Sequence, residues 1–173
     1  MDSGVAAVMG AAVGMVGTTL AAAVAGLSAQ RQVRAEHRHW RRQLRRDAYS
    51  AFTARTDELR KVLKEINTAL IRPGPDLDAV REALDVARGL LHSELADAQA
   101  TVEIEGPEKL ARMAEELSRS LSACVAAISA ASLGQGAGHT SVGTDPQGIR
   151  RFLDHASSKR AQFVEHARRT IDV

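Results

Sequence analysis

The stretch LDAVREALDVARGLLHSELADAQATV, residues 77–102, decides the fold class. Its apolar residues recur in steps of three and four over nearly four heptads, which places them on one face of an α-helix. Charged or polar residues occupy most of the positions between them, so the pattern predicts an amphipathic helix that buries one face against other helices. The predicted inward stripe is Leu77, Val80, Leu84, Ala87, Leu91, Leu95, Ala98 and Val102.

Stop signals flank this helix on both sides. Asp76 is a good N-cap, and Arg72-Pro73-Gly74-Pro75 before it ends the preceding helix. Gly106-Pro107 ends the helix, and Pro107 suits the first position of the next one. The inward stripe of that next helix is predicted to hold Leu110, Met113 or Ala114, Leu117, Leu121, Cys124 or Val125, and Ile128.

Two outer helices complete the prediction. Residues 30–70 contain no Gly or Pro and are rich in good helix formers. Residues 134–148 hold five Gly and one Pro and are predicted to be a flexible loop, followed by a helix from about Asp145 to Ile171. The two inward stripes are Leu44, Ala48, Phe52, Leu59, Val62 or Leu63, Ile66 and Leu70, and then Ile149, Phe152 or Leu153, Ala156, Phe163 and Ala167.

These helices predict an all-α protein, with residues 47–173 forming an antiparallel four-helix bundle of up-down-up-down connectivity. Composition agrees, because aromatic residues make up only 3% of the chain and a core of Leu, Val, Ile and Ala suits close-packed helices. The single cysteine, Cys124, lies in an apolar run and is expected to be a buried, inert thiol.

The N-terminal segment carries a second prediction. Residues 4–29 contain no charged side chain and would span roughly 39 Å as a helix, enough to cross a bilayer. We therefore expect residues 1–29 to form a single-pass transmembrane anchor that continues into the first bundle helix. Its nine Ala and five Gly make insertion marginal, and a cleaved signal peptide or a soluble Ala-rich helix remains an alternative.

Glycine spacing inside this segment suggests helix–helix packing. Gly10 and Gly14 form a G-x-x-x-G pair that Gly17 and Ala21 continue on one face. One interpretation is a homo-oligomer formed through the membrane. The other is that the pattern arises by chance in a segment so rich in small residues.

Residues 30–46 form a basic juxtamembrane helix in this prediction. Residues 1–46 carry a net charge of +5, and the rest of the chain carries −3. By the positive-inside rule, the N-terminus lies outside the cell membrane and the bundle is cytoplasmic. Either these side chains only set topology, or they also bind anionic lipid headgroups. The candidate membrane-surface residues are Arg31, Arg34, Arg38, Trp40, Arg41, Arg42, Arg45 and Arg46.

No motif in the sequence indicates an enzyme, a cofactor or a metal site. Gly138-His-Thr-Ser-Val-Gly143-Thr144 lacks the lysine of a P-loop and follows a helix instead of a strand. The six histidines show no metal-ligand spacing. The basic pairs Arg150-Arg151, Lys159-Arg160 and Arg168-Arg169 are predicted to be a solvated surface.

The sequence Arg45-Arg46-Asp47-Ala48-Tyr49-Ser50-Ala51-Phe52, with Trp40-Arg41-Arg42 before it, follows the Ala/Gly-rich segment. In this order, residues 4–55 resemble a group of small, uncharacterised actinobacterial membrane-anchored helical proteins. The resemblance implies an Ala/Gly-rich span followed by an Arg-Arg-x-Ala-Tyr-x-x-Phe segment, and it implies no activity. Tyr49 and Phe52 are expected to seal the first helix against the bundle.

Three functions fit these features. The leading hypothesis is a membrane-anchored helical scaffold that binds an unidentified protein partner and has no catalytic activity. The second is an oligomerising membrane-active or accessory protein of the defence or lysis type. The third, for which no recognition module is found, is a soluble Arg-rich regulator that binds nucleic acid.

Overall fold

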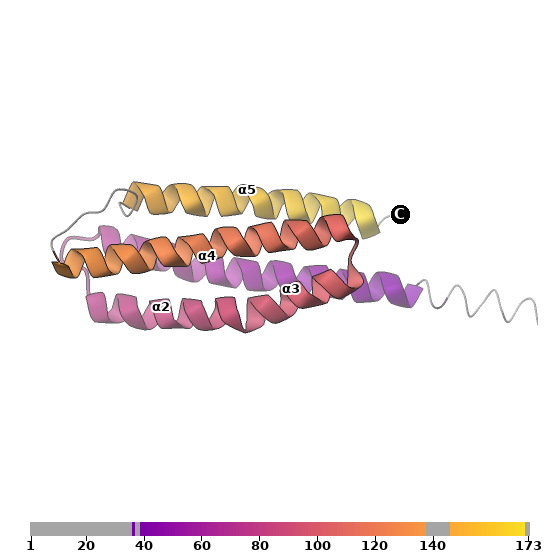
Figure 1. Ribbon diagram of the computed structural model, residues 1–173, viewed down its shortest axis with the longest axis horizontal. Helices are drawn as coiled ribbons and strands as arrows, with labels where there is room; N and C mark the ends of the chain where they lie inside the picture. The colour runs from indigo at the N-terminus through magenta and orange to yellow at the C-terminus, as the bar shows by residue number, and fades with distance from the viewer. Residues whose placement is uncertain (1–35, 37–38, 138–145, 172–173) are drawn as a thin grey trace, which may run out of the picture. The chain divides into compact units, whose positions relative to one another are not determined.

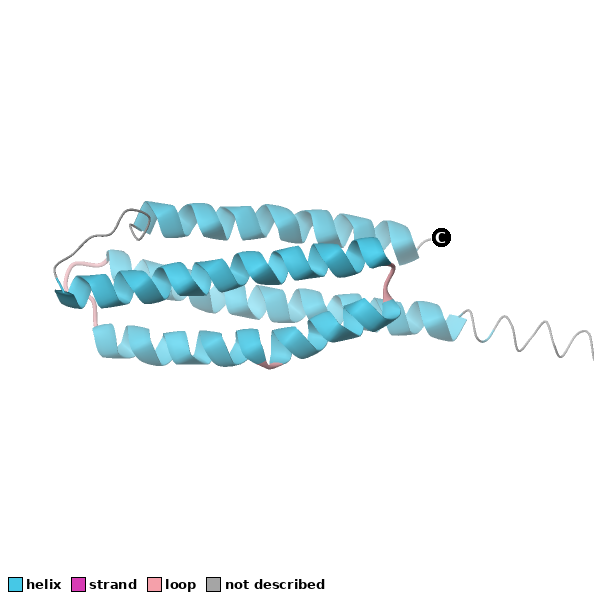
Figure 2. Ribbon diagram, viewed as in Figure 1, coloured by secondary structure: helices cyan, strands magenta, loops and turns pink. Residues whose placement is uncertain are grey.

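The computed structural model describes residues 36, 39–137 and 146–171 of the chain. A first helix covers residues 39–71. It is followed by α2 (Leu77–His92), α3 (Glu94–Glu105), α4 (Glu108–Ala137) and α5 (Pro146–Ile171). Within the described ranges the secondary structure is helical throughout, with no strand (Figure 2). Residues 43–173 form one compact unit, the bundle, which is distinct from the unit of residues 1–42.

The bundle is antiparallel, as the sequence predicts. The first helix and α4 run in one direction, whereas the α2–α3 pair and α5 run in the other (Figure 1). Helix α4 packs against α2, α3 and α5. Ion pairs join the first helix to α3 through Arg55 and Glu94, and to α5 through Asp57 and Arg160. Each helix therefore buries one face between two neighbours.

The predicted stripes form the core and settle the alternatives left open by the sequence. Leu63 is buried and Val62 only partly, Ala114 is buried and Met113 only partly, and both Cys124 and Val125 are buried. In α5, Leu153 is buried whereas Phe152 is 39% exposed. Leu44 and Leu77, at the start of their stripes, are only half-buried.

Aromatic side chains seal the first helix against α5. The ring of Phe163 lies 5.0 Å from that of Phe52 and 6.1 Å from that of Tyr49, both in edge-on geometry. All three residues are buried, which confirms the role expected for Tyr49 and Phe52. Gly106 lies close to both Tyr49 and α3, because a Cβ there would be 3.2 Å from the Tyr49 hydroxyl and 2.6 Å from the Val102 carbonyl oxygen.

The helix predicted for residues 77–102 is divided at Ser93, a correction to the single helix expected. The Ser93 hydroxyl donates a hydrogen bond of 2.6 Å to the Gly89 carbonyl oxygen, so its side chain competes for the helical hydrogen-bonding partners. A Gly followed by a Ser one turn later is a common cause of a kink. The buried residues keep their three-four spacing across the break, so both halves face the core.

The loop predicted for residues 134–148 is shorter than expected. Helix α4 continues to Ala137 and α5 begins at Pro146, so the glycines at 134 and 136 extend a helix despite their low propensity. Pro146 takes the first helical position, where its missing N–H costs nothing. Pro107 instead precedes α4, and its carbonyl oxygen accepts from Leu110 and Ala111.

Among the helices that the structure describes, none is long and apolar enough to cross a membrane. The predicted anchor, residues 1–29, lies outside the described residues, as do Arg31, Arg34 and Arg38 of the basic segment 30–46 and the continuity between the anchor and the first helix. The first helix ends at Ile71, one residue beyond the predicted end, where Arg72-Pro73-Gly74-Pro75 begins. Gly74, with φ of 71°, makes that turn possible.

Candidate functional site

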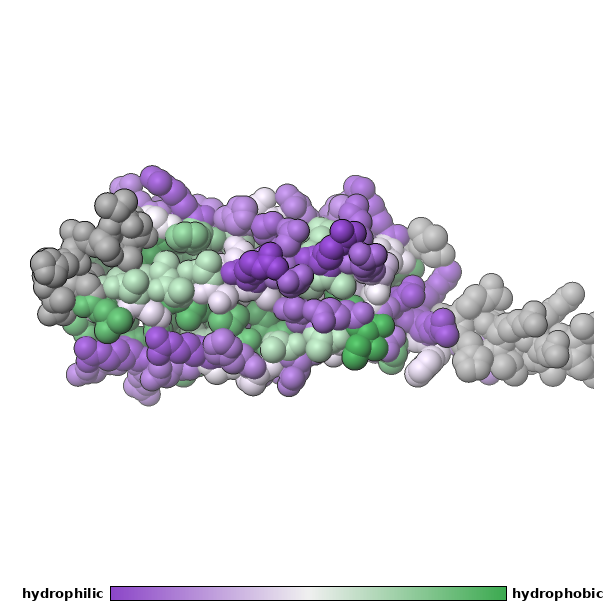
Figure 3. Space-filling view, viewed as in Figure 1, coloured by the Kyte–Doolittle hydropathy of each residue, from purple (hydrophilic) through white to green (hydrophobic). Residues whose placement is uncertain are grey.

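Helix α4 has two halves of opposite surface character. In its first half the exposed side chains are charged, and they include Glu108, Arg112, Glu115 and Arg119. From Ser120 to Ala137 it contains no Asp, Glu, Lys or Arg. In Figure 3 one half of α4 is dark purple and the other is a light green and white band between purple rows.

We define the outer face of α4 as its exposed residues in the uncharged half: Ser122, Ala123, Ala126, Ala130 and Leu133. Leu133 is 71% exposed. The opposite side of the same helix supplies Leu121, Cys124 and Ile128 to the core. A helix that is hydrophobic all round is normally buried, and between Ser120 and Leu133 only serines interrupt the apolar residues of α4. This half of α4 is covered on the core side only, which makes the outer face a candidate binding surface.

A groove of about 360 Å³ between α4 and α5 adjoins the outer face at Ala123. Phe152, which is partly exposed, forms a second apolar part of its lining. The groove is also lined by Glu116, Arg119, Ser120, His155 and Lys159. Its position follows from the packing, because small side chains at Ser120 and Ala123 leave space beside the larger ring of Phe152.

Ion pairs hold the rim of this groove in place. Lys159 Nζ lies 2.6 Å from Glu116 Oε2 and joins α5 to α4. This hydrogen bond and the charge of Lys159 lower the pKa of Glu116, so its carboxylate stays ionised. Arg119 pairs with Glu115 at 2.5 Å. The charged groups of the rim are therefore paired. The apolar floor of the groove, which we define as Ala123 and Phe152, is the part that lacks a partner.

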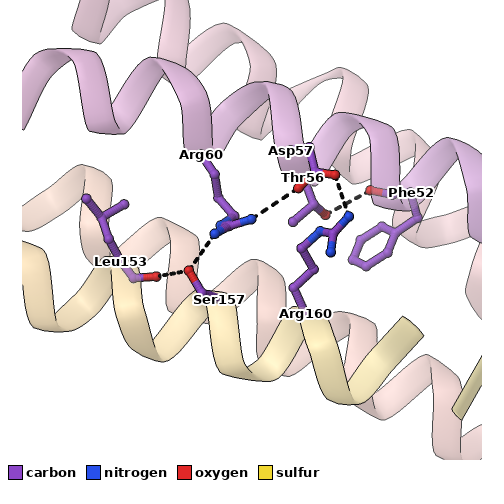
Figure 4. A network of polar contacts seen from close by, with 7 residues as sticks. All are labelled: Phe52, Thr56, Asp57, Arg60, Leu153, Ser157 and Arg160. Carbon is purple, nitrogen blue, oxygen red and sulfur yellow. Dashed lines mark hydrogen bonds and ion pairs between the residues drawn. The ribbon is translucent and has the colours of Figure 1, made fainter. Parts of the chain in front are cut away.

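A polar network on another side of α5 fixes this helix against the first helix (Figure 4). Asp57 accepts from Arg160 at 2.5 Å and from Arg60 at 3.1 Å. Arg60 also donates to the Ser157 hydroxyl, which donates to the Leu153 carbonyl oxygen. The network therefore sets the position of α5, and with it one wall of the α4–α5 groove.

The middle basic pair of α5 is the exception to the solvated surface predicted from sequence. Lys159 reaches Glu116 of α4, whereas its neighbour Arg160 reaches Asp57 of the first helix. Adjacent residues on a helix project about 100° apart, so the two residues form ion pairs with two different neighbouring helices. Arg150, Arg151 and Arg168 are exposed, as predicted.

A second groove, of about 450 Å³, lies beside the turn at residues 73–75, between the first helix and α2. Its apolar lining includes Ile66, Ala69 and Val80. Glu65, Arg72 and Asp76 add charges to its lining. Ala79 and Ala83 of α2 also line it, and Val86, one turn further along α2, is 53% exposed.

The predicted membrane-surface residues fall into three groups. Arg31, Arg34 and Arg38 lie outside the described residues. Trp40, Arg41, Arg42 and Arg46 are exposed, and Trp40 is 59% exposed. Arg45 is half-buried, and its Nε donates a 2.9 Å hydrogen bond to the Glu105 carbonyl oxygen at the end of α3. The Nε–H group of Arg45 therefore makes a contact within the bundle.

The remaining sequence predictions concern the glycine face, metal ligands and the cysteine. Gly10, Gly14, Gly17 and Ala21 lie outside it. No group of three or more His, Cys, Asp or Glu residues suited to a metal ion occurs among residues 36, 39–137 and 146–171. Cys124 is buried, and burial raises the pKa of its thiol to about 11, which agrees with an inert thiol.

Comparison of the chain with protein-family models, with curated proteins and with solved structures finds no match. The candidate site therefore depends on geometry and surface chemistry alone. The outer face of α4 was not among the sites predicted from sequence. The sequence does contain an indication of this face, the uncharged run that begins at Ser120. The inward stripe accounts for only some of the apolar residues in that run.

Proposed function

We propose that this protein is a membrane-anchored helical scaffold that binds a protein partner through the outer face of α4. The observation that carries the proposal is the uncharged half of α4, where Ala126, Ala130 and Leu133 are exposed. Elsewhere on the bundle the surface carries ion pairs. Exposed apolar surface that is continuous and rimmed by polar residues is typical of protein–protein binding sites.

The chemistry of the surface favours a helical protein partner over a small polar ligand. The outer face offers methyl groups and one leucine side chain, and it offers no charged group for a polar ligand to bind. Small side chains allow the backbone of another helix to approach closely. The paired rim at Glu116 and Lys159 would remain accessible to solvent, as rims of protein interfaces usually do.

The membrane anchor in this proposal is supported by the sequence of residues 4–29 and by the basic residues after it. Such an anchor would hold the bundle at the inner surface of the cell membrane. The resemblance of residues 4–55 to small actinobacterial membrane-anchored proteins supports the same placement. A scaffold of this kind would concentrate its partner at the membrane.

Carbonate extraction of membranes from cells that produce the full chain tests the anchor. The chain is expected to stay in the membrane pellet and to be released by detergent. Val13→Arg with Val16→Arg, which places two charges in the uncharged segment, is expected to move it to the soluble fraction. A full chain that is extracted by carbonate would contradict the anchor.

A photoreactive amino acid at position 126 of the full chain tests the binding face. Irradiation of cells is expected to give adducts with a protein from position 126 and none from position 100, a matched exposed alanine on α3. Equal adduct yields from the two positions, or none from either, would contradict binding through the outer face.

A further inference from the structure

We propose that the partner of the outer face of α4 is a second copy of this chain, bound antiparallel, with Leu133 of each copy in the α4–α5 groove of the other. This inference deepens the proposed function and rests on its assignment of the outer face as a binding surface. It goes further in naming the occupant and the register.

The spacing of the outer face matches a helix–helix seam. Ala123, Ala126, Ala130 and Leu133 are separated by three, four and three residues, which are the intervals of alternating heptad positions. The inner side of the same helix repeats the spacing at Leu117, Leu121, Cys124 and Ile128. Helix α4 thus carries a second seam on the side opposite the core.

An antiparallel partner makes this seam complementary to itself. If Ala126 lies opposite Ala130 of the second copy, then Leu133 lies opposite Ala123, and the two-fold axis repeats both contacts. The largest exposed apolar residue of one copy therefore meets one of the smallest of the other. Such a surface satisfies the requirement of a closed two-fold interface, in which one patch binds its own copy.

The groove at Ala123 provides the second, independent observation. It opens between α4 and α5 about 15 Å along the helix from Leu133, since ten residues separate the two positions. Ala123 and Phe152 give it an apolar floor. In the antiparallel register, Leu133 of the second copy is presented to this floor. One surface therefore carries both the projecting side chain and the hollow that receives it.

Charge distribution selects the antiparallel orientation over the parallel one. The antiparallel register pairs the uncharged halves, so Glu116 and Arg119, which line the groove, face Leu133 and the uncharged end of the other α4 instead of their own copies. A parallel pair would continue along the charged half and bring Glu116 close to Glu116 of the other copy. Like charges at facing positions oppose association, so the parallel pair is disfavoured.

We expect weak, reversible pairing, because one helix seam with two small grooves is less extensive than the standard interface of about 1,600 Å². A dissociation constant in the micromolar range, roughly 1–100 μM, is therefore expected for the full chain in detergent. Enrichment of the chain in a membrane would raise its local concentration toward this range.

Cysteine cross-linking tests the register in the full chain purified in detergent. In a Cys124→Ala background, Ala126→Cys and Ala130→Cys chains are prepared separately, mixed and oxidised. The antiparallel register predicts that the mixed 126–130 disulfide forms at least tenfold faster than either the 126–126 or the 130–130 disulfide. A parallel pair would favour the two symmetric disulfides, and that result would overturn the proposal.

Substitution of Leu133 tests the groove contact. Leu133→Glu is expected to raise the dissociation constant at least tenfold in sedimentation equilibrium. Ile104→Glu provides the matched control, because Ile104 of α3 is 79% exposed and lies outside the outer face. This control is expected to associate like the parent chain, and helical content measured by circular dichroism checks that both variants fold.

The outcomes separate this inference from the proposed function. A monomer at all concentrations up to 1 mM (roughly tenfold above the expected range) would overturn the second copy as the occupant. A dimer that survives Leu133→Glu and is lost in Gly10→Leu with Gly14→Leu would place association in the N-terminal segment, which also overturns it. Adducts from position 126 to a different protein alone would overturn the second copy and leave the scaffold proposal standing.

Discussion

Asp57 of the first helix and Arg160 of α5 are separated by 103 residues, and the Oδ2 atom of one lies 2.5 Å from the Nη2 atom of the other. The same carboxylate accepts from Arg60 through its other oxygen. One acidic group thus holds two guanidinium groups at a helix–helix contact. Because α5 also forms a wall of the α4–α5 groove, this contact connects the stability of the bundle to the geometry of the candidate site.

Asp57→Ala should lower the free energy of unfolding by about 1 kcal/mol, because it leaves the half-buried guanidinium groups of Arg60 and Arg160 without their shared acceptor. Partial exposure of the pair limits the effect. Urea unfolding followed by circular dichroism gives the value. The control Asp85→Ala, which removes the exposed pair with Arg88 inside α2, should cost no more than about 0.5 kcal/mol. Equal losses would show that the network does not connect the helices.

Phe163→Ala should destabilise the bundle by about 3–5 kcal/mol, since the ring is fully buried against Tyr49 and Phe52. Phe152→Ala removes the same atoms from the same helix at a position 39% exposed, and it should cost less than about 1 kcal/mol. Thermal and urea unfolding compare the two variants. A similar cost for both would contradict the inward placement of Leu153 and the outward placement of Phe152.

Gly106→Ala should destabilise the chain by about 1–3 kcal/mol, because the added Cβ would lie 2.6 Å from the Val102 carbonyl oxygen and 3.2 Å from the Tyr49 hydroxyl. Gly89→Ala should act in the opposite direction. Apart from the adjoining backbone of its own helix, nothing lies within 4 Å of its Cβ position, and alanine favours a helix by about 0.5–1 kcal/mol over glycine. The sign of the change in urea midpoint distinguishes the two positions.

Stability should fall between pH 9 and pH 11. Burial raises the pKa of Cys124 from 9.0 to about 11, so the folded chain holds the thiol proton more tightly than the unfolded chain. The contribution is fully present below pH 9 and is lost as the pH rises toward 11. Burial raises the pKa of Tyr49 as well, which acts in the same direction.

Urea titrations of the parent chain and of Cys124→Ala at pH 8, 9, 10 and 11 isolate the thiol. The difference in unfolding free energy between the two should change by about 2–3 kcal/mol in favour of the variant, because one pKa unit corresponds to about 1.4 kcal/mol. A constant difference across this range would show that the thiol titrates alike in both states.

The sequence predicts most of the bundle because three-four spacing marks a buried face directly. The stripe from Val80 to Val102 proved to be core at every position, and the stops at Pro73 and Pro107 lie where helices end or begin. The break at Ser93 was missed because a side-chain hydrogen bond to Gly89 leaves the apolar period unchanged. Gly134 and Gly136 misled the prediction of the loop, because glycine only lowers helix propensity.

The candidate site was harder to predict than the fold. Periodicity identifies one buried face, so the inward stripe of α4 obscured a second apolar face at Ala123, Ala126 and Ala130. The cross-helix pairs of Lys159 and Arg160 depend on which acidic residues face them, and sequence spacing does not give this. The proposed partner role of α4 rests on the exposure of Leu133 and Phe152, which the sequence period does not give.

The rate at which a maleimide modifies the outer face tests the central claim, that a protein covers this face, most directly. In a Cys124→Ala background, Ala126→Cys and Ala100→Cys full chains are labelled in permeabilised cells and again after unfolding in urea. We predict that position 126 reacts at least tenfold more slowly than position 100 in the cell, and equally fast after unfolding. Equal rates in the cell would contradict the claim.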